Sequence, residues 1–499
     1  MSAFDVSAKG KRKGESVGDP DAFVASSGDL VFEDPYGDDI IEESEDEEEG
    51  GEEVLGEEVE KEGDDATENM EMETAVSPGK TQPKRATVYR PAEGEELEFD
   101  PSAYVMYHAM STEWPCLSFD ILRDNHGEGR NRFPLTMFLA CGSQAERADR
   151  NCVTLLKLTD LNKTQEKGSD DEDSDDDNDD NNSDDDLDDD PVMQHTNIPH
   201  RGGVNRIRSM PQSPGVIATL SDTSNVHIFD ATKVYGTMQQ KAGLTVAPQT
   251  KLSPCFTMKD HREEGFAIDW SPVTAGRLLT GDCAGVIRLT SGAAGSGGGG
   301  FGGWRVDSNK FMGHSGSVED IQWSPSESSV FSSASSDCTV KIWDTRGKTG
   351  PQLSIDAHTA DVNVISWNRN VTYLMASGSD DGSFKVWDLR ALSKNEPLAH
   401  FKYHTAPITS IEFAQHDESL ITVSSEDDQV SIWDLSVEAE TDAEDVGDDQ
   451  QEFPPQLLFI HQGQRNVKEV HFHPQIPGLL VSTAEDGFNV FKPAINVSS

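Results

Sequence analysis

Three copies of one unit, each opening with a histidine and closing with a Trp-Asp pair, constrain the fold of this chain more than any other feature. The clearest copy runs from Gly313 to Asp344 and contains three short segments in which apolar and polar residues alternate. Trp343, Trp387 and Trp433 end successive copies, so the period is 44 and then 46 residues. Alternation over about five residues is typical of half-buried strands, and a period of this length is typical of one four-stranded propeller blade.

Weaker copies of the unit extend the same register in both directions. His200, His261 and His461 each open a unit that ends without a Trp-Asp pair. A further set of alternating segments precedes them, at Cys116–Leu122, Leu135–Ala140 and Val153–Leu158. The total is seven blades, and closing them into a ring removes nearly all exposed sheet edge. We therefore predict an all-β fold, a seven-bladed WD-repeat β-propeller, for residues 96–499.

The start of the predicted ring leaves one assignment open. Cys116–Leu122 is either the innermost strand of blade one or the strand that closes blade seven, and the strand count favours blade one. Before it, Asp100 is a good helix N-cap and Pro101 fits a first helical turn. We predict a short N-terminal helix from there to about Ser111, covering the outer edge of blade seven. Residues 1–95 have few apolar residues and many acids, and they are predicted to be a disordered acidic region.

Three long insertions interrupt the predicted blades. Residues 162–190 and 436–455 are acidic, whereas residues 290–303 form a Gly-Ser-rich run typical of a flexible linker. Each insertion follows the third strand of its blade and precedes the fourth. Since alternate connections of an antiparallel meander emerge on opposite faces, we expect all three insertions on one face of the ring. The first and third insertions belong to blades one and six, which flank blade seven.

The acidic residues are clustered, and they give the chain a net charge of -52. Residues 42–65 hold 15 acids in 24 positions, and residues 170–190 hold 15 acids in 21 positions. Tracts of this kind stay solvated and are either solubilising tails or polyanions that hold a basic partner. Because two tracts exist and one interrupts the fold, we favour a client-facing role for the second tract. Its leading acids are Asp170, Asp171, Glu172, Asp173, Asp175, Asp176 and Asp177.

The predicted helix and the third insertion together suggest a client-binding groove. Met106 and Met110 are four residues apart and would share one face of a helix. Pro454 and Pro455 stiffen the return of the insertion, and we expect them to hold its acids near that helix. An apolar wall facing an acidic wall suits an amphipathic basic helix. The acids concerned are Glu444, Asp445, Asp448 and Asp449.

His314, Asp320, Trp343 and a serine (Ser335 or Ser336) have the residue types of a hydrolase site. We interpret them as a buried hydrogen-bond chain that locks the strands of one blade together. Other blades keep only part of the set, with Val364, Ser410 and Ala267 at the position of Asp320. The sequence has no nucleophile elbow and no phosphate-binding glycine loop. We therefore predict no enzymatic activity, no cofactor and no metal site.

Two compositional features bear on the cellular setting. Six cysteines are scattered without a Cys-x-x-Cys pair, so we expect reduced core thiols, and no apolar window reaches membrane length. A short basic cluster is either a nuclear address or a solubilising feature, and we favour the nuclear address. It consists of Lys9, Lys11, Arg12 and Lys13.

Four serines stand one to three positions before acidic residues. They resemble substrates of an acid-directed kinase, and the alternative is that they are polar filler within the tracts. The four are Ser44, Ser169, Ser174 and Ser183.

Several stretches carry a family resemblance. Tyr107–Asp120 (YHAMSTEWPCLSFD) resembles the N-terminal signature of WD-repeat histone chaperones of the retinoblastoma-binding and chromatin-assembly type. Val204–Gln212 resembles the second blade of these proteins, and Pro454–His461 resembles their proline-paired loop. Within that family, Ala140–Gln144 and the acidic tracts are most similar to the glutamate-rich WD-repeat proteins. The resemblance implies a client groove beside the proline-paired loop and a role as chaperone of a large-subunit ribosomal protein.

We therefore expect a non-enzymatic chaperone or assembly factor that shields a basic client until the client meets ribosomal RNA. The expected location is the nucleus and nucleolus, with shuttling to the cytoplasm left open. Contact with pre-ribosomal particles is expected to be indirect, without sequence-specific nucleic-acid binding. One alternative is a histone chaperone, with core histones as clients. The other is a substrate receptor of a cullin ubiquitin ligase, whose Trp-Asp-x-Arg boxes Trp343–Arg346 and Trp387–Arg390 resemble.

Overall fold

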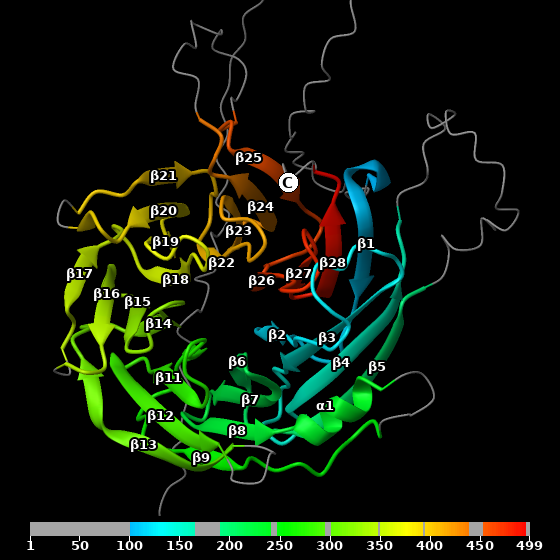
Figure 1. The fold of residues 1–499 in the computed structure, drawn as a ribbon, viewed down its shortest axis with the longest axis horizontal. Coiled ribbons are helices and arrows are strands. Elements are labelled where there is room, and N and C mark those ends of the chain that lie inside the picture. The colour runs from blue at the N-terminus through cyan, green and yellow to red at the C-terminus, as the bar shows by residue number, and fades with distance from the viewer. Residues whose placement is uncertain are drawn as a thin grey trace, which may run out of the picture. The chain divides into compact units, whose positions relative to one another are not determined.

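The computed structural model describes residues 100–164, 190–240, 247–294, 301–347, 350–392, 395–438 and 453–495. Their strands form seven four-stranded antiparallel sheets, which are arranged as blades around a central axis (Figure 1). The prediction of an all-β, seven-bladed propeller is therefore confirmed. Among the described residues, no helix is both long and apolar enough to cross a membrane.

Blades one to six each use four strands that are consecutive in the chain. Blade one contains β2 (Phe119–Ile121), β3 (Leu135–Gly142), β4 (Cys152–Leu161) and β5 (Val192–Pro199). Blade two contains β6 (Val204–Met210), β7 (Ser213–Ser221), β8 (Val226–Asp230) and β9 (Phe256–Met258), with helix α1 (Thr232–Met238) before β9. Blade three contains β10 (Ala267–Trp270), β11 (Arg277–Gly281), β12 (Val286–Ala294) and β13 (Phe301–Met312).

The next three blades repeat this order. Blade four contains β14 (Val318–Trp323), β15 (Val330–Ser335), β16 (Thr339–Asp344) and β17 (Leu353–Asp356). Blade five contains β18 (Val362–Trp367), β19 (Leu374–Ser379), β20 (Ser383–Asp388) and β21 (Ala399–Lys402). Blade six contains β22 (Ile408–Phe413), β23 (Leu420–Ser425), β24 (Gln429–Asp434) and β25 (Leu457–His461). In every case the first strand is innermost, so the preference for β2 as the inner strand of blade one is confirmed.

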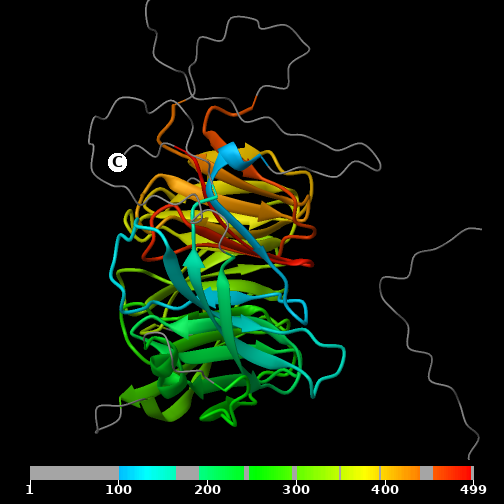
Figure 2. The same ribbon diagram turned by 90° about the vertical axis from the view of Figure 1, so that its right-hand side faces the viewer.

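Blade seven joins the two ends of the folded region. It contains β26 (Glu469–Phe472), β27 (Leu480–Ala484) and β28 (Gly487–Pro493), and its outermost strand is β1 (Tyr104–Met110). Tyr107 of β1 lies opposite Phe491 of β28 in an antiparallel pair, and Figure 2 shows the two strands side by side. Sequence-distant strands thus close the ring.

The predicted N-terminal helix is wrong, although its place at the outer edge of blade seven is right. Asp100 does accept a hydrogen bond from the Ser102 backbone, but it caps only a 3-10 turn, Pro101–Ala103. Tyr104 and Met106 are buried in alternation, which is the period of a strand. The open edge of β28 offers this segment a full ladder of backbone partners, and a helix would leave that edge unpaired.

This change of element moves Met106 away from the predicted client groove. Met106 is 0% exposed and lies in the core between blades seven and one, against residues such as Phe119 and Phe488. Met110 is half-buried and packs against the same cluster. Met106 therefore cannot contact a client, because β1 turns its side chain into the ring.

The Gly-Ser-rich run differs from the predicted linker at its described ends. Residues 290–294 belong to β12 and residues 301–303 to β13, and the two strands stay paired as far as Ala294 and Phe301. A Cβ atom at Gly292 would lie 2.6 Å from the ring of Trp304. Glycine is thus needed there for packing as well as for chain freedom.

The cysteines differ in burial. All six are free thiols, and Cys116 and Cys141 are buried, whereas Cys255 is exposed. The expectation of core thiols therefore fails for Cys255, which lies just before the edge strand β9.

Replacing Met106 with Ala is expected to lower the free energy of unfolding by about 2–5 kcal/mol, because the substitution leaves a cavity in a dry core. The matched variant Met110→Ala, at a half-buried position of the same strand, should lose clearly less. Urea unfolding followed by tryptophan fluorescence measures both. Equal, small losses would place Met106 at the surface, as a helix would have done.

Candidate functional site

The residues that looked like a hydrolase site form a lock inside blade four. The two ring nitrogens of His314 lie 2.9 Å from an Asp337 carboxylate oxygen and 2.7 Å from the Ser333 hydroxyl. The Trp343 indole donates to the same hydroxyl over 2.8 Å. One chain of hydrogen bonds thus joins the loop before the blade, its second strand and its third strand.

The prediction of a hydrogen-bond chain within the blade is correct, but two of the predicted residues, Asp320 and the serine, do not belong to it. Asp320 lies on the inner strand β14 and accepts hydrogen bonds from the backbone of Ile321 and Ile365. Ser335 and Ser336 instead accept backbone hydrogen bonds near the turn after β15. The acid of the lock stands in that turn, at Asp337, because only the turn residue reaches the loop histidine.

With the acid in the turn, the lock recurs in neighbouring blades. His358 and Trp387 share the Ser377 hydroxyl in blade five, at 2.8 and 2.9 Å. In blade six His404 and Trp433 share Ser431, which lies on the third strand rather than the second. In blade three His261 lies between Thr280 and Asp282.

The titration of these groups supports a structural role. Burial lowers the pKa of His358 to about 4, against the charge of Asp381, so its imidazole is neutral at pH 7. Burial would raise the pKa of Asp337, but hydrogen bonds from Thr339 and His314 hold it at about 2. A buried neutral histidine that is hydrogen-bonded to a turn carboxylate, in more than one blade, serves to hold the strands of the blade together. Among the described residues, no cluster of three or more His, Cys, Asp or Glu side chains could hold a metal ion.

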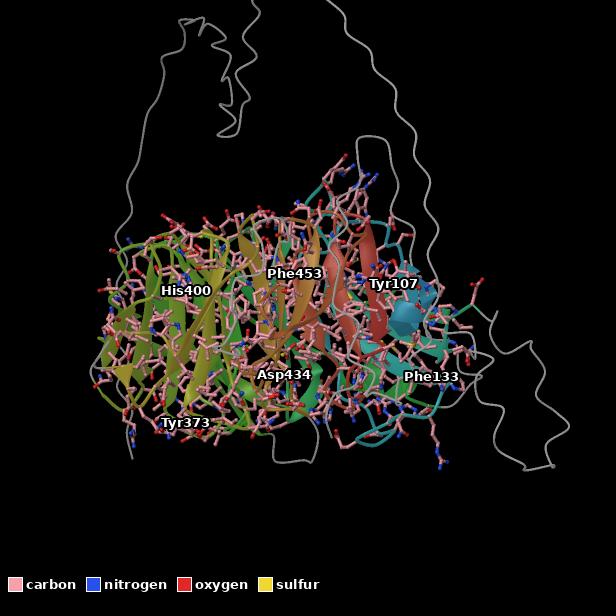
Figure 3. All side chains as sticks on the ribbon, turned by 90° about the horizontal axis from the view of Figure 1, so that it is seen from above. Tyr107, Phe133, Tyr373, His400, Asp434 and Phe453 are labelled. Atoms are coloured by element: carbon pink, nitrogen blue, oxygen red, sulfur yellow. The ribbon has the colours of Figure 1, made fainter. Side chains whose placement is uncertain are left out.

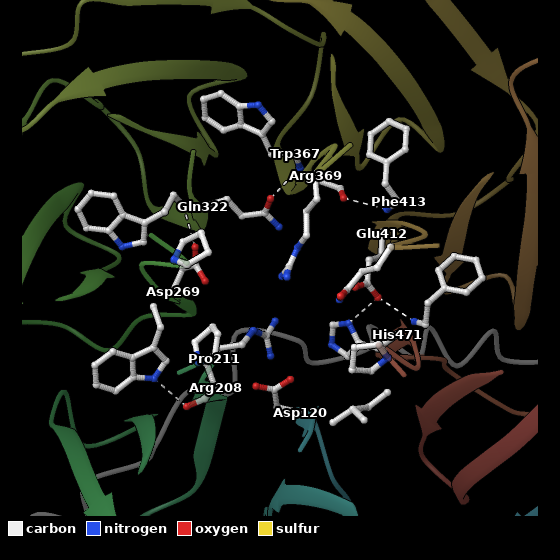
Figure 4. A pocket seen from close by; sticks show the side chains of 18 of the residues that line it. Asp120, Arg208, Pro211, Asp269, Gln322, Trp367, Arg369, Glu412, Phe413 and His471 are labelled. Carbon is white, nitrogen blue, oxygen red and sulfur yellow. Dashed lines mark hydrogen bonds and ion pairs between the residues drawn. The ribbon is translucent and has the colours of Figure 1, made fainter. Parts of the chain in front are cut away.

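The central channel has a polar wall built by the inner strands. Alternate residues of these strands face a cavity of about 170 Å³ (Figure 4). One ring of seven positions, one from each inner strand, contains Asp120, Arg208, Asp269, Gln322, Ser366, Glu412 and His471. The alternation explains why polar residues occur inside strands that are otherwise apolar.

These channel residues connect each blade to the next. Five of the ring positions have side chains that accept a backbone N–H from the following inner strand, for example Asp269 from Trp323 at 2.7 Å. The other four pairs are Asp120 with Ser209, Gln322 with Trp367, Ser366 with Phe413, and Glu412 with Phe472. The Trp270 indole donates to the Arg208 carbonyl, and Glu469 accepts from the Phe119 backbone. All seven junctions are thereby joined, and we call this set the inter-blade belt.

The belt closes on a buried charge cluster whose members come from blades six, seven and two. The Glu469 side chain is 0% exposed and lies 2.9 Å from Arg206 and 2.7 Å from Arg208. His471 lies 3.0 Å from Glu412 and 3.4 Å from Glu469. Burial disfavours the charge of His471, but the two carboxylates raise its pKa to about 9. The arginines and His471 hold the pKa of Glu469 well below its usual value, despite its burial.

The rim of blade seven carries an aromatic cluster where β1 meets β25. The Tyr104 hydroxyl lies 2.8 Å from Nδ1 of His461, and the Tyr104 ring packs edge-on against Phe459 with 5.3 Å between centroids. Tyr107 and Phe459 are half-buried, and Tyr107 lies at this rim (Figure 3). Ile495 also packs against the cluster. An apolar strip therefore reaches the surface between blades six and seven.

Both acidic insertions start from this rim. The Thr164 backbone donates to the Val105 carbonyl, and the Tyr107 backbone donates to the Thr164 hydroxyl. Residues 162–164 therefore run along the free edge of β1. On the other side, Gln456 bonds through its backbone carbonyl to Asp434 and through its side chain to Val437, which holds the described ends of the third insertion beside β25.

The predicted site residues fall into three groups. Pro454 and Pro455 lie in the turn before β25, half-buried and exposed respectively. Met106 is in the core and Met110 is half-buried, as described above. The remaining predicted residues lie outside the described ranges: Glu444, Asp445, Asp448, Asp449, Asp170, Asp171, Glu172, Asp173, Asp175, Asp176, Asp177, Ser44, Ser169, Ser174 and Ser183.

The rim also contains residues that the sequence argument missed. Phe459 on β25 belongs to the rim. Phe453 and Tyr403 pack together with 6.4 Å between ring centroids, but they lie on the side of β25 that faces blade five. The signal was the apolar run Leu457–Ile460 directly after the paired prolines. This run forms β25, the outermost strand of blade six, so no further strand of that blade covers its outward-facing residues.

Family models match two parts of the chain. The histone-binding protein model, which is named for RBBP4 and for a component of the CAF1 complex, matches residues 94–162. The model of the WD domain, G-beta repeat, matches residues 306–344, 350–388 and 395–434. These last matches include the three inner strands of blades four, five and six.

Three relatives match most of the chain. A Dictyostelium discoideum protein named glutamate-rich WD repeat-containing protein 1 is 55% identical over 419 residues, which are 82% of this chain and 84% of that protein. The Arabidopsis thaliana protein HEAT STRESS TOLERANT DWD 1 is 44% identical over 80% of this chain and 89% of its own length. The Schizosaccharomyces pombe ribosome assembly protein rrb1 is 41% identical over 80% of this chain and 82% of its own length.

The charge cluster predicts a pH dependence of stability. The pKa of His471 is raised from 6.5 to about 9, so its contribution is fully present below about pH 6.5 and is lost as the pH rises through 9. The difference in unfolding free energy between the wild-type protein and a His471→Gln variant should therefore shrink between pH 6 and about 9.5. Urea unfolding across this range measures it. Parallel pH profiles for the two proteins would contradict a charged His471.

Proposed function

Because this chain belongs to the family of glutamate-rich WD-repeat proteins, we propose that it is a non-enzymatic assembly factor that binds and shields a basic protein client. The histidines that open blades three to six are engaged in hydrogen bonds within their blades, which supports a structural rather than a catalytic role. The Schizosaccharomyces pombe relative is named as a ribosome assembly protein, which supports a large-subunit ribosomal protein as the client. Its place of action is then the nucleus, including the nucleolus.

The observation that carries this proposal is that the described ends of both acidic insertions lie beside the rim of blade seven. Residues 162–164 are bonded along β1, and Gln456 is bonded to the end of β24. Between these anchors lies the half-buried aromatic strip that includes Tyr107 and Phe459. A client with a basic, amphipathic segment would place its apolar side on the strip and its cations toward the two acidic segments.

Electrostatics also accounts for release of such a client. Many weak contacts between acidic side chains and a basic client are screened and exchangeable. Ribosomal RNA offers a denser array of negative charges and competes for the same cations. Acidic segments of this kind would therefore keep the client from binding nucleic acid nonspecifically and release it when ribosomal RNA competes for its cations.

A second candidate is a histone chaperone. The match of residues 94–162 to the histone-binding family model favours it, because that segment includes β1, the strand to which the first anchor is bonded. Core histones are also basic and would meet the same surface. Competition between a purified large-subunit ribosomal protein and a histone H3–H4 mixture for the full-length chain separates the two clients by their relative affinities.

The rim proposal predicts that reversing Glu444 and Asp445 to Lys weakens client binding by at least about tenfold, since desolvated charge pairs of a client would become repulsive. The matched control is Glu327→Lys with Glu396→Lys, which changes the net charge equally at exposed positions of blades four and five. Calorimetric titration with the client, after a check of folding by circular dichroism, measures both. Equal weakening by the two double variants would indicate a general charge effect and would count against the rim.

Removal of residues 169–190 is expected to leave the ring folded, because loop length affects stability only weakly. Client association should slow, and its dependence on salt should flatten, because the tract steers a basic partner from a distance. Stopped-flow association at several KCl concentrations tests this. An unchanged salt slope would show that the tract does not face the client.

A further inference from the structure

We propose that a cationic strip on the face of the ring that carries the loops after the inner strands binds the phosphate backbone of single-stranded RNA. The strip consists of Arg369, Arg123, Arg130, Arg132 and Lys163. It does not depend on the proposed client, because the client is basic and these residues would repel it. Two of these cations are paired with carboxylates, Arg123 with Glu128 and Arg130 with Asp124. The excess positive charge of the strip therefore rests on Arg132, Arg369 and Lys163, in a chain whose net charge is -52.

The centre of the strip is a cavity of about 300 Å³ in the long loop between β2 and β3. No carboxylate is among the described residues that line this cavity, and the donors around it suit a phosphate oxygen. Its wall consists of His126, Arg130, Asn131, Arg132, Pro134, Leu135 and Thr136. An anion-binding site needs this combination of positive charge and hydrogen-bond donors.

Arg130 is fixed in place but incompletely bonded. Its terminal nitrogens donate to Asp124 and to the Thr136 carbonyl, both at 2.8 Å. Its Nε is buried and has no hydrogen-bond partner among the described residues. A buried donor without an acceptor is unfavourable, so a phosphate oxygen that reaches it would gain a hydrogen bond that the fold itself does not supply. Arg132, beside it, is exposed and has no hydrogen-bond or ion-pair partner in the described part of the chain.

Toward the channel, the strip continues on the loops that follow the inner strands. The position three residues after the channel-ring residue differs between the blades. Four blades have proline there, for example Pro272 in blade three. Blades one and five have Arg123 and Arg369 instead. Arg123 donates to Gln415, which occupies the same position in blade six. Arg369 points into the channel mouth (Figure 4). Burial lowers the pKa of His473 to about 3, and the charges of Arg130 and Arg123 act in the same direction, which is consistent with a positive field here.

Toward the rim, the strip ends in a cation beside an aromatic ring. The Lys163 ammonium lies 5.5 Å from the centroid of the Phe133 ring, and Phe133 is half-buried near this face (Figure 3). Phe133 directly precedes Pro134, which lines the cavity. Several cations in a row with an aromatic ring at one end form the pattern that binds a single strand without reading its sequence. A lone phosphate would need only the cavity.

The test measures binding of a fluorescein-labelled 20-nucleotide oligouridylate to the full chain, by fluorescence anisotropy at several KCl concentrations and without any client. The test variant is Arg132→Glu with Arg369→Glu, since neither side chain has a bond that the fold requires. The matched control is Lys259→Glu with Arg305→Glu, which makes the same charge change at exposed positions of blades two and three. The test variant should bind at least about tenfold more weakly, and its salt slope should fall by about 1.4. The control should lose less than about threefold.

Two results would overturn the proposal. One is equal loss of affinity in the test variant and the control, which would mean that RNA senses only net charge. The other is a combination of two findings. RNA binds neither the full chain nor the protein without residues 169–190, and a labelled peptide of those residues binds the shortened protein. The chain's own acidic tract would then be the occupant of the strip. Client binding is a separate readout, so failure of the proposed function would leave this test unaffected.

Discussion

The ring depends on polar contacts between neighbouring inner strands. Each blade buries apolar residues against the next, but apolar contact alone does not fix the distance or register of two sheets. The inter-blade belt supplies this through hydrogen bonds such as those of Asp269 and Glu412, and charged acceptors strengthen several of them. At the last junction Glu469 serves both the belt and the charge cluster, so closing the ring and burying that cluster are one event.

The period of the repeats predicted the architecture, whereas a segment without a repeated counterpart was mispredicted. Blades four to six carry the same histidine and Trp-Asp ends, so their period alone determines the architecture. The segment Tyr104–Met110 has no repeated counterpart, and its helix-like start at Asp100 and Pro101 was a sound local reading. What makes it a strand is the unpaired edge of β28, nearly 400 residues away in the chain. Local propensity cannot detect a partner at that distance.

The lock shows a similar limit at the scale of single atoms. The residue types were correct, but Ser333 and Ser335 are two apart on one strand and point to the same face. Only the register between β15 and β16 decides which of them meets His314 and Trp343. The channel residues were hidden for a related reason, since Arg208 or Asp269 inside a strand becomes meaningful only when seven inner strands are assembled. The paired prolines predicted a client site beside blade seven, which stays a proposal, while the aromatic strip there could be seen only from the pairing of β1 with β28.

The closure of blade seven by strands from both ends also has a consequence for synthesis. Six blades can form as their own strands leave the ribosome, but β1 must wait for β28, which ends at Pro493. Until then the rim between β1 and β25 does not exist. A chain that lacks β28 therefore has no completed rim and cannot bind a partner there. The fold thus makes this surface dependent on synthesis of the last blade.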